Sequence, residues 1–234
     1  MPRLIEMGAL LLRCKQRADK VFDDHVGGDD TAEWRRLISE VWAADVFQPV
    51  AGTGSRYFET RSTLTTTGAA YVSEPSGIMN PIRLDYVDAS GQHHELQQVS
   101  IQEEGSFSGA PAGDRAYRFA HVDDRIYLYP TPPSGQTYEL LYVPQATDLS
   151  GYADDACVDV VNADGEACVI WGVAALARVK ASQDVALHMA KQQLHRDRLE
   201  YWAASLALTQ PARRHHADEY DERVPFEEGD WRFR

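Results

Sequence analysis

Two amphipathic helices are predicted by the apolar positions of the first fifty residues. Apolar side chains recur at steps of three and four along the first helix, as on one buried helical face: Leu4, Met7, Leu11, Cys14, Ala18 and Val21. Asp30 and Glu33 have the spacing of a capping box at the start of a second helix. Its apolar face comprises Trp34, Leu37, Ile38, Val41, Trp42 and Ala44. Pro49 and the Gly52–Ser55 run are expected to end it.

The middle of the chain, residues 55–148, has the alternation and turn residues of short β-strands. The run from Thr60 to Thr67 is polar and favours β structure, as in an exposed or edge strand. Further alternating runs cover residues 82–87, 117–121, 126–129 and 138–142. Several short strands separated by turns predict an antiparallel β-sandwich or a barrel-like domain. Residues 103–113 are rich in Gly, Ser, Ala and Pro, which predicts a mobile loop.

Two more helices are predicted after residue 156. The first runs through Lys180 and is apolar nearly all round, so the rest of the chain or a partner subunit must cover it on several sides. The second opens near Ser182 and Asp184 and closes before Pro211. Its expected buried face comprises Leu187, Ala190, Leu194, Tyr201, Ala204 and Leu208, with Asp197 as an interruption.

These patterns predict an α+β protein in which one helical domain is discontinuous. Residues 1–50 and 156–210 form its two parts, because neither helical pair can bury its apolar face alone. The β domain of residues 55–148 is inserted between them, and residues 211–234 form an extended tail without a core of its own.

Charge and composition argue against several classes of protein. The chain has 23 Lys and Arg against 36 Asp and Glu, a net charge of −13, so it lacks the basic surface of a DNA reader. Cys14, Cys157 and Cys168 form no CxxC pair, which argues against a disulfide framework and a zinc site. We see neither a signal peptide nor an apolar run of membrane-spanning length, so we expect a soluble protein made in the cytoplasm, with no membrane partner.

The sequence gives no local signal of catalysis or of a cofactor. The pairs His93-His94 and His215-His216 are better explained as solvated residues than as metal ligands, and Asp123-Asp124 as turn residues. The chain has no GxSxG, Walker, HExxH or GxGxxG motif. We therefore expect no catalytic residue, no metal and no cofactor. The tyrosine-rich strands leave open a glycan-binding or hydrolytic β domain, although such residues more often fill a core.

The order of elements and one hairpin pattern resemble a known family. The capped helix Asp30-x-x-Glu33-Trp34 is followed by a Thr-rich strand and then by a hairpin running from Asp124 through Tyr129-Pro130-x-Pro132 to Tyr138-x-Leu140-x-Tyr142. An Ala-rich helical pair ends the pattern. Over about residues 1 to 208, this arrangement resembles the head-to-tail adaptor (connector) proteins of tailed bacteriophages.

The resemblance implies a structural protein of the virion neck, made in the host cytoplasm. Such adaptors form a ring, commonly a dodecamer, that joins the portal protein to the downstream tail or nozzle protein and continues the DNA channel. DNA would pass through without specific binding. The runner-up interpretation is a tail-completion or minor tail protein.

In that family a terminal segment often docks onto the portal during assembly. The segment 211–234 carries charged and aromatic residues without a fold, as does a segment that becomes ordered on binding. The predicted portal-binding residues are Arg213, Arg214, Tyr220, Phe226, Trp231 and Phe233.

Overall fold

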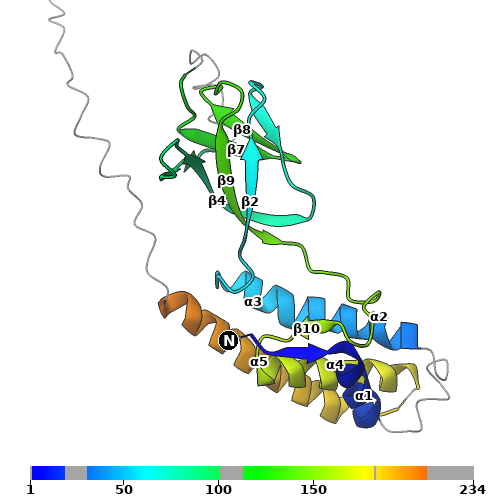
Figure 1. Cartoon of the computed structure of the whole chain (residues 1–234). Helices are drawn as coiled ribbons and strands as arrows, with labels where there is room; N and C mark the ends of the chain where they lie inside the picture. Colours follow the sequence, from blue (N-terminus) through cyan, green and yellow to red (C-terminus); the bar gives the residue numbers. More distant parts are fainter. Residues whose placement is uncertain (1, 19–30, 101–112, 182, 210–234) are drawn as a thin grey trace, which may run out of the picture.

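A computed structural model of the chain describes residues 2–18, 31–100, 113–181 and 183–209. It is a mixed α+β structure with a layer of helices at one end and two β-sheets at the other (Figure 1). Two chain segments connect these parts, one leading into the first long strand of the sheets and one leaving the last. The residue boundaries of the domains, as given in the sequence analysis, remain predictions.

The helices contribute to one hydrophobic core. Their bounds are α1 Met7–Ala18, α2 Thr31–Trp42, α4 Ala163–Lys180 and α5 Ala186–Thr209. This core contains Leu10, Trp34, Ile38, Val173 and Leu199, so segments from both ends of the sequence share it. Helix α4 packs against α1, α2 and α5, which explains why α4 is apolar nearly all round. Its apolar surface is thus covered largely within the chain.

The first helix is shorter than its predicted apolar stripe. Leu4–Glu6 form strand β1, which pairs antiparallel with β10, Cys157–Asp159. Helix α1 then begins at Met7, whose N–H donates to the Ala156 carbonyl at 2.9 Å. Leu4 is exposed, because its backbone is committed to the strand pair and its side chain does not continue the helical face. Asp30, the predicted cap of the next helix, lies outside the described residues.

The second helix continues past its predicted stop at Pro49. After α2 the chain makes a π-helical turn, Ala43–Phe47, and a short helix α3, Gln48–Gly52. Pro49 lies in the first turn of α3, directly after the π-helical turn, so the proline does not end the helix. The wider turn also shifts the buried face to Val46 and Phe47 and leaves Ala44 exposed, contrary to the predicted face.

The β region contains two four-stranded sheets, in the orders β2-β9-β4-β5 and β3-β8-β7-β6. The strands of the first are β2 Thr60–Thr65, β4 Ile78–Val87, β5 His93–Glu95 and β9 Thr137–Pro144. Those of the second are β3 Tyr71–Ser73, β6 Gln97–Gln98, β7 Arg118–Val122 and β8 Arg125–Tyr129. The pairings within them are antiparallel except β6 with β7, which is parallel.

Both sheets contribute side chains to a second core. Leu84, Tyr138 and Leu140 come from the first sheet and Phe119 and Leu128 from the second, each almost fully buried. In the described part of the chain neither sheet closes on itself, so the barrel alternative was wrong. Strand β2 pairs only with β9 and so leaves one edge of its sheet open. This agrees with the prediction of an exposed or edge strand from the polar run 60–67. Most of the predicted loop 103–113 lies outside the described residues.

Candidate interaction surface

The six residues predicted to bind the portal all belong to the segment 210–234, which lies outside the described residues. Their docking role therefore stays a prediction. The described part of the chain instead presents two apolar surfaces, and both involve helix α5.

The first surface is the outer side of α5, where the predicted buried face proved to be exposed. Leu187 is 63% exposed, Leu194 40%, Tyr201 80% and Leu208 87%. The side of α5 that meets α4 carries other residues, including Leu199 and Ala203, which are fully buried. Helix α5 is therefore apolar on two sides, and the periodicity of its larger residues marks the outer one.

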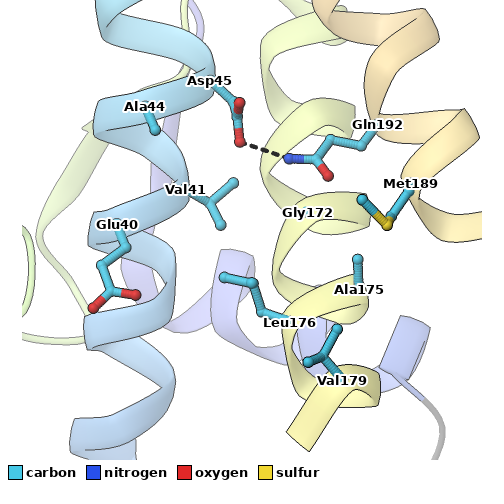
Figure 2. Close-up of a pocket in the computed structure, with 10 residues that line it drawn as sticks. All are labelled: Glu40, Val41, Ala44, Asp45, Gly172, Ala175, Leu176, Val179, Met189 and Gln192. Carbon is cyan, nitrogen blue, oxygen red and sulfur yellow. Dashed lines mark hydrogen bonds between the residues drawn. The ribbon is translucent and has the colours of Figure 1, made fainter. Parts of the chain in front are cut away.

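Polar contacts hold α5 in this orientation. Asp45, in the π-helical turn, accepts a hydrogen bond from Gln192 at 2.6 Å (Figure 2) and another from Arg196 at 2.9 Å. Asp164, in the first turn of α4, contacts the His195 ring at 2.8 Å. These groups lie on the inner side of α5, so the exposed apolar residues face away from the rest of the chain. The sequence analysis missed Asp45, whose only signal is a carboxylate within an otherwise apolar run.

Trp171 on α4 is covered by polar neighbours rather than by an apolar face. The Arg17 guanidinium lies over its ring, 4.2 Å from the centroid, and the His188 ring meets it edge-on at 5.2 Å. Burial, together with the charges of Arg178 and Arg17, lowers the pKa of His188 below its ordinary value. The folded structure therefore favours the neutral form of His188.

This environment predicts a pH-dependent loss of stability. Since the unfolded chain binds a proton at residue 188 more readily than the folded chain, the stabilisation is complete above the ordinary histidine pKa of 6.5. It is lost as the pH falls below that value. We expect the free energy of unfolding of the His188→Gln variant to fall less than that of the wild type between about pH 7.5 and about pH 5.5. Urea unfolding at both pH values checks this, and parallel losses in the two proteins would contradict it.

The second surface is an apolar groove between α2, α4 and α5 (Figure 2). It encloses about 280 Å³. The lining residues are Glu40, Val41, Ala44, Asp45, Gly172, Ala175, Leu176, Val179, Met189 and Gln192. Gly172 lies at its floor, where an added Cβ would come within 2.6 Å of a Val41 methyl group, so α2 and α4 approach closely there.

The other candidate residues have ordinary structural contacts. His93 and His94 lie on β5 and contact different carboxylates, Glu139 at 3.1 Å and Asp88 at 3.1 Å. Asp123 adopts a left-handed turn between β7 and β8, with φ of 54°. Burial raises the pKa of the Cys14 thiol, and it raises that of Cys168 to about 12. Within the described residues, no cluster of three or more His, Cys, Asp or Glu could hold a metal ion.

Over the described ranges, no helix combines the length and the apolar character that crossing a bilayer requires.

Comparison with known proteins identifies the family. A family model described as SU10 adaptor protein matches residues 9–223. No curated protein gives a significant match. The matched segment spans nearly all of the chain, including the helices, both sheets and the start of the predicted tail, and it confirms the resemblance to phage head-to-tail adaptors. The chain therefore belongs to the SU10 adaptor protein family and is a structural protein of the bacteriophage virion that interacts with other capsid or tail proteins.

Proposed function

We propose that copies of this chain form a ring at the neck of the virion, between the portal protein and the downstream tail or nozzle protein. The observation that carries the proposal is the family match over residues 9–223. The proposed ring is a dodecamer that continues the DNA channel. Its role is structural, without catalysis or a cofactor.

The proposal assigns different tasks to the parts of the chain. The two pairs of helices, packed as a discontinuous bundle, build the ring, and the β domain is available to neighbouring virion proteins. The tail 211–234 docks onto the portal. The aromatic and arginine side chains of this segment support this last step, because such residues are typical anchors of protein interfaces: Arg213, Arg214, Tyr220, Phe226, Trp231 and Phe233.

The charge of the chain fits a channel that releases DNA. With a net charge of −13, the ring would repel the phosphate backbone rather than hold it by counterion release. DNA would then slide past during ejection without specific binding.

Protein stoichiometry in purified particles tests the proposed location. Quantitative mass spectrometry should find about one copy of the chain per portal subunit, as expected for a closed ring on a symmetric neighbour. A chain that is absent from particles would overturn the proposal. A ratio far from one, with the chain located along or at the end of the tail, would favour a tail-completion or minor tail protein instead.

A further inference from the structure

The outer side of α5 carries a line of exposed apolar residues, interrupted by Asp197 between Leu194 and Tyr201. We define the α5 ridge as Leu187, Leu194, Tyr201 and Leu208, which recur every seven residues and therefore lie in one line along the helix. None of them is buried, and Tyr201 and Leu208 are among the most exposed large apolar residues described. A line of exposed apolar residues at this spacing is typical of a helix that packs against another helical surface.

The groove between α2, α4 and α5 has the features of a receiving surface. Its walls are apolar, and several of its residues are open to solvent at the mouth, including Ala44, Val179 and Met189. Met189 has a flexible side chain that adapts to an inserted residue. Met189 and Gln192 line the groove from α5, whereas the ridge lies on a different side of the same helix, so one copy can present both surfaces at once.

Charge favours a second copy of the chain as the occupant. Three exposed charged residues flank the ridge, Lys191, Asp197 and Arg198, and two of them are basic on a chain that is otherwise strongly acidic. Arg198 also lies 3.9 Å from Asp164 of the same chain. Glu40 is exposed at the mouth of the groove. Its carboxylate forms an ion pair with Arg36 on the same helix at 2.6 Å. Because this pair is exposed, Glu40 can leave Arg36 and pair with a basic residue of another copy. The charges that flank the ridge have one positive charge in excess, and this excess is complementary to Glu40 at the mouth of the groove in another copy.

We propose that the α5 ridge of one copy packs into the α2–α4–α5 groove of the next copy. The contact joins two different surfaces, so it repeats from copy to copy rather than stopping at a two-fold dimer, and it gives a closed ring when the rotation between copies closes. This inference rests on the proposed ring, and it names the surfaces that build it.

Site-specific photo-crosslinking of the full chain tests the contact. The photoreactive residue p-benzoylphenylalanine replaces Leu194 on the ridge, or Gln193 as a matched control one position away and off the ridge. Both proteins are irradiated as purified concentrated chain and in assembled particles. Covalent adducts are sized on denaturing gels, and the joined peptides are identified by mass spectrometry. Unchanged thermal unfolding of both proteins shows that the fold tolerates the probe.

The expected result is a ladder of covalent oligomers from position 194, joined to peptides of residues 40–44 or 172–179 in another copy. Position 193 should give at least several-fold less adduct. Adducts to a different surface of the chain, adducts to another protein, or no adduct from position 194 in either sample would each overturn the proposed contact. The presence of the chain in particles is scored separately, so failure of the neck location is distinguishable from failure of the ridge–groove contact.

Discussion

Removal of residues 211–234 is expected to abolish association with the portal while leaving the helices and sheets folded. Among the described residues, the last buried member of the hydrophobic cores is Ala203, which precedes this segment. The removed segment contains the aromatic side chains proposed as anchors, Tyr220, Phe226, Trp231 and Phe233. Since a few aromatic and arginine residues carry most of the energy of a typical interface, losing them together should leave no measurable binding.

Co-sedimentation with purified portal rings measures this loss, and circular dichroism shows whether the truncated chain keeps its fold. Single substitutions show whether the aromatic side chains of the segment carry the binding energy. Trp231→Ala should weaken binding by about 2 kcal/mol or more, roughly 30-fold. The matched control His216→Ala changes a residue of the same segment that is expected to remain solvated, and it should bind as the wild type does. A truncated chain that joins the portal normally would show that docking uses another surface.

Sequence patterns predicted which segments are helices and strands better than they predicted which side of each helix is buried. Strand alternation identified β4, β7, β8 and β9, because alternate residues such as Leu84 and Leu128 enter a shared core. Periodicity failed on α5, where the inner side is made of Leu199, Ala203 and polar residues that fit closely against α4. A helix with apolar residues on two sides has no single stripe, and only its neighbours decide which side is buried.

The two apolar surfaces that involve α5 could not be predicted from sequence patterns either. Asp45 and Arg196 lie 151 positions apart in the chain, yet their contact sets which side of α5 is exposed. The π-helical turn that positions Asp45 leaves no pattern in a single sequence, and the groove exists only where three helices converge. These features depend on tertiary packing, which neither spacing nor composition encodes.

The resemblance to phage adaptors rests on packing residues rather than on a chemical site. In the hairpin that carried it, Ile126 and Leu128 are fully buried between the sheets. Arg125 lies over the Tyr71 ring, 4.6 Å from its centroid. These residues act through packing, so the pattern that carries the resemblance is one of fold rather than of a reactive site.

Trp34 is expected to be among the most costly residues to remove from the helical core. Its side chain is fully buried, with Lys15 near the ring at 5.9 Å. Trp34→Ala should lower the free energy of unfolding by about 3–5 kcal/mol through lost burial and a residual cavity. Typical domains are stable by only about 5–15 kcal/mol, so the variant should be close to unfolding at physiological temperature.

The smaller substitution Trp34→Phe separates packing from hydrogen bonding. The Nε1 of Trp34 is buried and has no hydrogen-bond partner among the described residues, so replacing the indole by a phenyl ring removes no hydrogen bond. We expect this variant to lose about 1 kcal/mol, from reduced volume alone. The control Tyr117→Ala changes a half-exposed residue outside the helical core and should cost about 0.5 kcal/mol. Urea unfolding followed by circular dichroism gives all three values. Equal losses for Trp34→Phe and Trp34→Ala would contradict the packing explanation, because they would show that the indole N–H stabilises the core.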